Sequence, residues 1–144
     1  MVIYLQGNCM QIVKAKIDDI KEIARMNKLL IEDEQHPNKM NIYQLTDRMT
    51  GWLENEYICY LATDGKKISG YCLYRDDGEY YYLRQLFVER QYRRKGIATQ
   101  ILDWMYSNIW QDKKVRIDVL SHNENAIAFY ENYGFSIGCL RMEK

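Results

Sequence analysis

The chain carries no net charge, because its 20 basic residues are balanced by 20 acidic ones. It therefore lacks the overall basic field that gathers nucleic acid or coats an anionic membrane, and we expect neither as a partner. No apolar run approaches the roughly 18 residues of a membrane-spanning helix, and the start, MVIYLQGNCM, lacks the pattern of a signal peptide. These absences predict a soluble, cytoplasmic protein in which any strong anion binding is local.

Cysteine and histidine are sparse and scattered. The four cysteines form no C-x-x-C pair, so neither a zinc site nor a disulfide framework is indicated, and no metal is expected. The two histidines, His36 and His122, show no spacing typical of metal ligands or of an activated nucleophile, and we expect both at the surface.

The apolar content is sufficient for one domain. At 144 residues, 47% of them hydrophobic, the chain can bury a full core. No linker, repeat or low-complexity segment divides residues 1–144. Met10 stands directly before the first convincing strand pattern, so residues 1–9 are treated as a possible N-terminal extension of that domain.

Alternating and helical periodicities predict the order of elements. Asn41 or Thr46 is expected to cap the second helix, and Gly134 to end the last one. The order predicts a single α/β (α+β) domain, a mixed central sheet covered by helices. Strands are predicted at 11–17, 57–63, 68–75, 80–88, 115–120 and 135–142, and helices at 18–30, 45–53, from 97 onward, and at 123–133.

One short stretch, RRKGIA at 93–98, places three positive charges and a glycine between a predicted strand and a predicted helix. The first N–H groups of a helix have no intrahelical partners and lie at the positive end of its dipole, so the stretch predicts a local anion site. Gly96 lets a ligand approach the backbone closely. The two common nucleotide signatures, G-x-x-x-x-G-K-[ST] and G-x-G-x-x-G, are absent, so a different pyrophosphate carrier is indicated.

The stretch resembles the Q/R-x-x-G-x-G/A pattern of the GNAT superfamily of N-acetyltransferases, whose loop holds the pyrophosphate of acetyl-coenzyme A (acetyl-CoA). Leu86–Val88 just upstream and NENAIAFYENYGF at 123–135 resemble the same family in the same order. The resemblance implies a sheet whose parallel strands splay apart at the cofactor, and acetyl-CoA as co-substrate. It implies these cofactor-binding residues: Leu86, Phe87, Val88, Arg93, Arg94, Lys95, Gly96, Ile97, Ala98, Thr99, Asn123, Phe129 and Tyr130.

The resemblance also implies roles in the chemistry. Tyr130 would protonate the departing thiolate, since a phenol with a pKa of roughly 10 is protonated at neutral pH. The backbone N–H of Val88 or a neighbour would stabilise the oxyanion. Simple packing remains an alternative for Tyr130 and Phe129, and Asn123 could serve only as a helix cap.

The general base is where the sequence departs from many relatives. A glutamate often lies a few residues before the segment at Leu86, but an ungapped count finds Tyr82, Leu83 and Arg84 there. The acidic run IEDEQH offers a replacement, with Glu34 the best candidate proton acceptor. The alternative is that this run is only a solvated helix end. The predicted acceptor-side residues are Glu32, Asp33, Glu34, Tyr82 and Arg84.

The sequence thus predicts an acetyl-CoA-dependent N-acetyltransferase, monomeric or homodimeric, that acts on a primary amine of a small cationic molecule or peptide. The missing strand glutamate leaves open a catalytically weak acyl-CoA-binding regulatory module of the same fold. A third hypothesis, nucleic-acid binding through RQYRRK and the many tyrosines, conflicts with the zero net charge.

Overall fold

Six strands form one sheet whose spatial order follows the chain order, in a computed structural model that describes residues 2–5 and 8–144. Neighbouring strands are antiparallel except for the last pair, β5 and β6, which is parallel. The mixed sheet predicted from the sequence is confirmed. The strands are β1 (Val2–Leu5), β2 (Asn8–Lys14), β3 (Tyr57–Thr63), β4 (Ile68–Asp76), β5 (Tyr80–Val88) and β6 (Lys114–Ile117).

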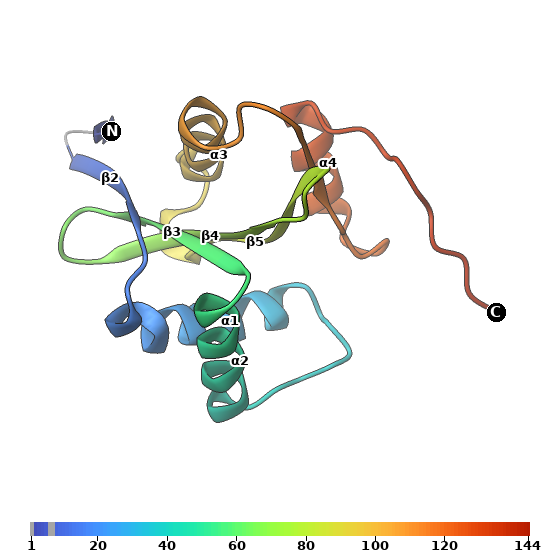
Figure 1. Cartoon of the computed structure of the whole chain (residues 1–144), viewed down its shortest axis with the longest axis horizontal. Helices are drawn as coiled ribbons and strands as arrows, with labels where there is room; N and C mark the ends of the chain where they lie inside the picture. The colour runs from blue at the N-terminus through green and yellow to red at the C-terminus, as the bar shows by residue number, and fades with distance from the viewer. Residues whose placement is uncertain (1, 6–7) are drawn as a thin grey trace.

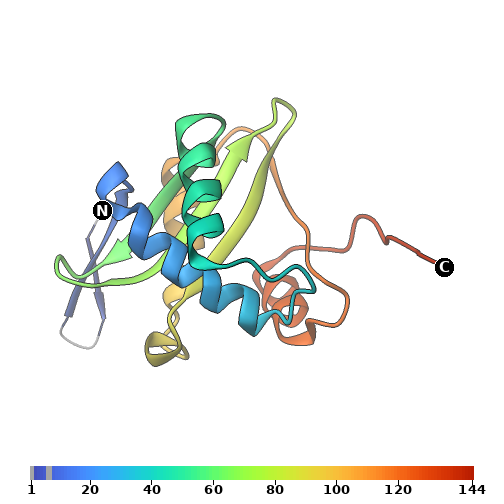
Figure 2. The same ribbon diagram turned by 90° about the horizontal axis from the view of Figure 1, so that it is seen from below.

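Helices cover both faces of the sheet (Figure 1). On one face lie α1 (Ile20–Asp33) and α2 (Ile42–Glu54), which cross the strands as Figure 2 shows. On the other lie α3 (Ile97–Asn108) and α4 (Glu124–Tyr133). Short 3-10 turns at Ile17–Asp19 and Arg90–Tyr92 precede α1 and α3. None of the helices in the described part of the chain is long and apolar enough to cross a membrane.

Two apolar layers follow from this arrangement, because successive side chains of a strand point to opposite faces. Leu83 of β5 packs with Ile101 and Met105 under α3. Tyr71 of β4 and Phe87 of β5 pack on the opposite face, under α1 and α2. The face on which each β5 side chain lies therefore decides whether it meets α3 or the first two helices.

The helix caps follow the sequence signals. Of the two predicted caps of α2, Asn41 is the one used: the Gln44 N–H donates to Asn41 Oδ1 at 2.9 Å, and the Asn41 N–H donates to Gln44 Oε1 at 3.0 Å. Gly134 ends α4 with φ 125, a left-handed conformation that a glycine adopts without strain.

The predicted last strand, residues 135–142, is wrong. Residues 135–144 form no strand, and the apolar side chains that gave the alternating pattern are exposed: Ile137 63%, Leu140 71% and Met142 87%. Alternation marks a segment that fits a sheet, but a strand also needs a neighbour, and in the described chain β6 pairs only with β5. The first predicted strand is shifted as well, since β2 spans Asn8–Lys14 and pairs with β1 in the segment treated as an extension.

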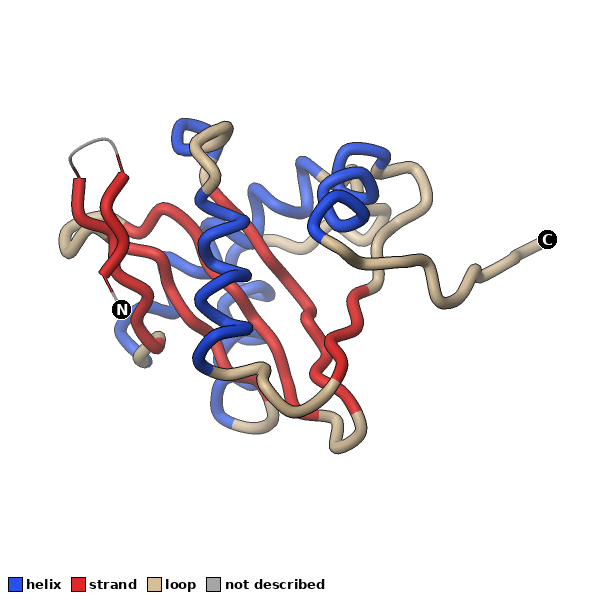
Figure 3. The backbone as a smooth tube through the Cα atoms, turned by 90° about the horizontal axis from the view of Figure 1, so that it is seen from above, coloured by secondary structure: helices blue, strands red, loops and turns tan. Residues whose placement is uncertain are grey.

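Strands β5 and β6 separate where the cofactor was predicted. Their pairing runs from Tyr80↔Lys114 to Leu83↔Ile117 and stops there, so the rest of β5 has one free edge. Figure 3 shows the two strands diverging beyond this point. The other edge of β5 stays tight against β4: a Cβ on Gly70 would lie 2.3 Å from the Phe87 carbonyl oxygen, which explains the glycine.

A β-bulge lies at the same place. Leu73 pairs with Gln85 and Tyr74 with Leu83, so Arg84 is an extra residue on β5. A bulge of this kind re-aims side chains. Gln85 and Arg84 both reach the α1 and α2 face, where Gln85 meets Tyr71 and Arg84 meets Trp52.

Candidate active site

The glycine turn at 93–98 has the geometry of an anion cradle. Gly96 is the N-cap of α3 and is left-handed, with φ 73, and Arg94 is left-handed as well, with φ 62. The nearest atom that a Cβ on Gly96 would meet is Gln100 Nε2 at 4.0 Å, so space is open beside the first amides of the helix. Those amides point out of the helix end and carry the positive end of its dipole. Around them, Arg94, Lys95 and Thr99 are exposed, Ala98 is half-buried, and Ile97 is anchored in the core.

Arg93 is turned away from the cradle. Its Nε donates to the Val88 carbonyl oxygen at 2.8 Å, and its Nη2 donates to Asp33 at 2.6 Å. Arg90 donates to the same carboxylate at 3.0 Å. The side chain of Arg93 therefore connects the end of α1 to the end of β5. A role of Arg93 in cofactor binding stays a prediction.

The free edge of β5 presents backbone donors. The Glu89 N–H donates to the Ser69 carbonyl oxygen of β4 at 2.8 Å. Because N–H groups alternate sides along a strand, the N–H groups of Leu86 and Val88 face the edge that β6 has left. An extended ligand can hydrogen-bond there as an added strand does, which is the arrangement predicted for Leu86, Phe87 and Val88.

Helix α4 faces this edge with three predicted residues. Asn123 Oδ1 accepts a hydrogen bond from the Ala126 N–H at 3.2 Å, so Asn123 does cap the helix, and a cofactor role for it stays a prediction. Phe129 is half-buried against the core. Tyr130 is 8% exposed, and its ring lies edge-on to Phe129 and Phe135, with centroids 5.1 and 5.5 Å away.

The Tyr130 hydroxyl is held in its protonated form. Burial is the main cause that raises its pKa well above the usual range, and the charges of Cys72 and Glu34 add to it. Within residues 2–5 and 8–144 no hydrogen bond of this hydroxyl is found, and its oxygen is not among the fully buried polar atoms that lack a partner. A buried phenol that keeps its proton and has no partner is a donor available to a ligand.

The three acidic residues of the run have different surroundings in the structure. Glu32 and Asp33 are in the last turn of α1, and Glu34 is its C-cap. Partial burial would raise the pKa of Asp33, but the hydrogen bonds from Arg93 and Arg90 outweigh it and hold that pKa below the usual range. The Asp33 carboxylate is thus already paired with two arginines near the glycine turn. The predicted attraction of a cationic acceptor is therefore left to the exposed Glu32 and to Glu34.

Glu34 lies at the junction of two loops. Its carbonyl oxygen is 2.8 Å from Nε2 of His122, which donates to it when that nitrogen carries the proton. The carboxyl is half-buried, and burial, with a smaller contribution from Asp33, raises its pKa against the opposing charges of His36 and His122. The Glu34 charge also adds to the effect of burial in raising the pKa of Tyr71 and of Tyr130.

Replacing Glu34 by Gln should stabilise the fold at neutral pH. A carboxyl whose pKa is raised by folding contributes stability below its ordinary pKa, and this contribution is lost as the pH rises through the raised value. Gln imitates the neutral acid, so parent and variant should match near pH 4, and the variant should become modestly more stable toward pH 7. Urea unfolding across this range measures the difference. The exposed Glu32→Gln is the control, and a Glu34→Gln protein no more stable than the parent at pH 7 contradicts the assignment.

The strand position where relatives often have a glutamate holds no carboxylate. The Tyr82 hydroxyl donates to Asp118 at 3.0 Å, and burial followed by this hydrogen bond raises the pKa of Tyr82 to about 12. Tyr82 is therefore no base at neutral pH. Arg84 is exposed and donates to the Tyr57 hydroxyl at 3.3 Å.

Sequence reasoning missed a polar group beneath α1 and α2. Asn27 is 0% exposed, and its Oδ1 accepts from Arg48 at 3.0 Å. Arg48 and Arg84 both stack on Trp52, with the guanidinium carbons 4.3 and 4.6 Å from the ring centre. A signal for Asn27 was present, because it follows Ile23 and Ala24 at helical spacing and so falls on the buried stripe of α1.

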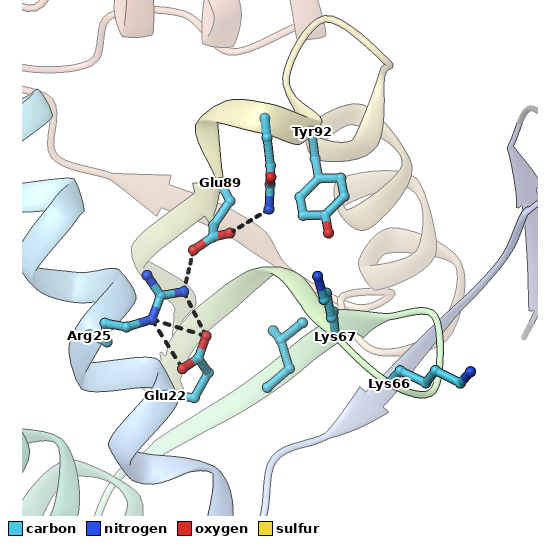
Figure 4. Close-up of a pocket in the computed structure, with 8 residues that line it drawn as sticks. Glu22, Arg25, Lys66, Lys67, Glu89 and Tyr92 are labelled. Atoms are coloured by element: carbon cyan, nitrogen blue, oxygen red, sulfur yellow. Dashed lines mark hydrogen bonds and ion pairs between the residues drawn. The ribbon is translucent and has the colours of Figure 1, made fainter.

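A separate open pocket of about 400 Å³ lies between α1 and the β3–β4 turn (Figure 4). Arg25 crosses it to reach Glu22 and Glu89, so its charge is already paired. This pairing holds the end of β5 on α1. None of the predicted cofactor or acceptor residues lines the pocket. Its lining is Glu22, Arg25, Lys66, Lys67, Ile68, Glu89, Gln91 and Tyr92.

This geometry agrees with what the chain is similar to. Residues 55–137 match the family described as an acetyltransferase (GNAT) domain, and they make up more than half of the chain. The chain therefore belongs to the GNAT acetyltransferase family, and it is an acyltransferase.

Two relatives are N-acetyltransferases by name. The N-alpha-acetyltransferase of Saccharolobus solfataricus is 25% identical over 145 residues, covering 90% of this chain and 82% of that protein. The thialysine N-epsilon-acetyltransferase of Mus musculus is 28% identical over 141 residues, covering 86% and 82%.

Solved structures share the fold. A possible acetyltransferase from Clostridium difficile 630 has a TM-score of 0.80 at 23% identity, covering 94% of this chain and 95% of that one. A predicted acetyltransferase from Clostridium acetobutylicum, crystallised with acetyl-CoA, has a TM-score of 0.71 at 20% identity, covering 94% and 95%. The likeness extends over nearly the whole chain, which confirms the GNAT-like architecture predicted from the sequence.

Proposed function

We propose that the protein transfers the acetyl group of acetyl-CoA to a primary amine of a small molecule or peptide. The observation that carries this proposal is the free edge of β5, which extends from the point where β6 separates toward the glycine turn. Tyr130 lies in the same apolar layer as Leu86 and Val88 of this edge. A long, thin cofactor with phosphate groups at one end and a thioester at the other can bind along this strand edge, with its phosphates at the glycine turn. The likeness to a structure crystallised with acetyl-CoA supports the same co-substrate.

The residues divide the reaction between two sides. On the cofactor side, the amides from Arg94 to Thr99 would bind the pyrophosphate, and the N–H groups of Leu86 and Val88 would bind the pantetheine arm and the acetyl oxygen. On the acceptor side, Glu34 would take a proton from the incoming ammonium, directly or through water. The neutral nitrogen then attacks the thioester carbon.

Breakdown of the resulting tetrahedral intermediate completes the reaction. The carbon–sulfur bond breaks as the amide forms, and the thiolate takes its proton from the Tyr130 hydroxyl. The proton that the nitrogen loses on becoming an amide returns to the tyrosine through solvent. Glu34 releases to solvent the proton that it took from the ammonium, so each turnover sets one proton free. Tyr130 ends the turnover protonated, which its raised pKa favours at neutral pH.

An amine as acceptor is supported by the names of the relatives, which are an N-alpha- and an N-epsilon-acetyltransferase. A cationic acceptor agrees with the negative charges of Glu32 and Glu34 at the C-terminal end of α1. The test is a screen of primary amines, with release of the coenzyme thiol as readout and the acetylated product identified by mass. Binding of acetyl-CoA without acetylation of any amine would favour the regulatory module instead.

A further inference from the structure

A group of hydrogen-bond donors near the predicted acceptor-side residues includes two buried donor atoms without acceptors, and the proposed reaction does not use it. We call it the donor cluster: Asn27 of α1, Arg48 of α2 and Arg84 of β5. Asn27 Nδ2 and Arg48 Nε are fully buried, yet neither has a hydrogen-bond partner among the described residues. A buried donor left unpaired costs about 1–3 kcal/mol, so two in contact call for an explanation.

Exchanging the oxygen and nitrogen of the Asn27 side-chain amide does not remove the unpaired donors. Asn27 Oδ1 already accepts from Arg48 Nη2 at 3.0 Å. Turning the amide over would put its NH₂ group against a guanidinium, which can only donate. The cluster therefore needs oxygen atoms from outside the fold.

The charges of the cluster are also unbalanced. Arg48 and Arg84 stack on the same Trp52 ring, so two like charges lie close together. No Asp or Glu in the described chain lies within salt-bridge distance of either arginine, and the undescribed residues 1, 6 and 7 are Met, Gln and Gly. Burial, and after it the charge of Arg84, lowers the pKa of Arg48. An anion between the two arginines would relieve this repulsion.

The cluster lies close, along β5, to the backbone proposed to hold the acetyl group. The bulge sends Arg84 and Gln85 to the α1 and α2 face, two residues before the backbone proposed to hold the acetyl group. Gln85 accepts from the Tyr71 hydroxyl at 2.8 Å, and Tyr71 senses the charges of both Glu34 and Arg48. The charges of Glu34 and of Arg48 in the donor cluster thus both act on the same buried tyrosine.

We propose that the donor cluster binds a carboxylate of the acceptor, so that the substrate is an amino acid or another amine that carries a carboxylate. This inference rests on the proposed acetyl transfer. A carboxylate offers two oxygens in one plane, which match the fork of a guanidinium, and its single charge lies between two cations. The ammonium end is then directed to Glu34, so the acceptor is a zwitterion rather than a simple cation.

The test uses matched pairs of amino acids and the amines formed by their decarboxylation, such as lysine with cadaverine, ornithine with putrescine and histidine with histamine. Each pair differs only in the carboxylate. The comparison is made for the pair that contains the best substrate. There, kcat/KM of the amino acid should exceed that of the decarboxylated amine by about 10 to 100-fold, the range for a charged hydrogen bond. In Arg84→Gln this ratio should fall toward one, mainly through a higher KM for the amino acid.

Arg84 is the better variant because it is exposed, whereas truncating the half-buried Arg48 also disturbs the packing of α2. The matched control is Arg116→Gln, which removes another exposed arginine stacked on an aromatic ring, Tyr80, at 4.1 Å. Two results overturn the inference but leave the proposed function in place. One is a parent enzyme that acetylates the decarboxylated amines as well as the amino acids. The other is an Arg84→Gln enzyme with the same ratio of kcat/KM between amino acid and amine as the parent. Acetylation of no amine at all overturns both.

Discussion

Gly96→Glu is expected to abolish the thermal stabilisation that acetyl-CoA gives to the parent protein. A ligand at about 100 times its dissociation constant stabilises the native state by roughly 2.7 kcal/mol. The variant places a carboxylate over the first amides of α3, where the pyrophosphate should lie, so the ligand meets both bulk and a like charge. Gly96 also has φ 73, so any side chain adds a strain of about 1–2 kcal/mol to the fold itself.

The strain and the lost binding can be separated by a matched glycine. Gly78 has φ 89 in the exposed turn between β4 and β5, and no atom lies within 4 Å of a Cβ placed on it. Gly78→Glu should therefore lower the melting temperature to a similar extent and keep the full shift with acetyl-CoA. A Gly96→Glu protein that also keeps the full shift, measured by differential scanning fluorimetry, would falsify the assignment of the turn as the pyrophosphate site.

The cofactor side could be predicted from the sequence because its parts are contiguous. Strand β5, the turn at 93–98 and the start of α3 follow one another, and each has a local signal: alternation, a glycine among charges, and helical spacing. The structure gives β5 as Tyr80–Val88, the bounds predicted from the pattern. Even the separation from β6 was foreseeable, since the family resemblance implies it.

The acceptor side could not be predicted in the same way, because it is assembled from distant segments. Arg48 on α2 and Arg84 on β5 meet only through Trp52, and the bulge that turns Arg84 toward it depends on pairing with β4. Counting along a strand assumes strict alternation, and one extra residue reverses the face on which every later side chain of the strand lies. The neutralisation of Asp33 by Arg93 likewise links residues 60 positions apart.

The second large effect is expected at Tyr130. Tyr130→Phe keeps the ring that packs against Phe129 and Phe135 and removes the only proton that the side chain can donate. If this hydroxyl protonates the departing thiolate, kcat should fall by about 10² to 10⁴-fold, the usual contribution of general acid catalysis, while the affinity for acetyl-CoA changes little.

The measurement is single-turnover kinetics with the best amine, so that chemistry rather than product release is observed. Tyr106→Phe is the matched control, because Tyr106 is a half-buried tyrosine whose pKa is also raised by burial, but it lies on α3 and stacks on Tyr133 at 6.0 Å. Removal of the Tyr106 hydroxyl should leave the rate within about twofold of that of the parent, as expected for a group without a role in the transition state. Equal rates for the parent and Tyr130→Phe would assign Tyr130 to packing alone, and the thiolate would then have to take its proton from water on the free edge of β5.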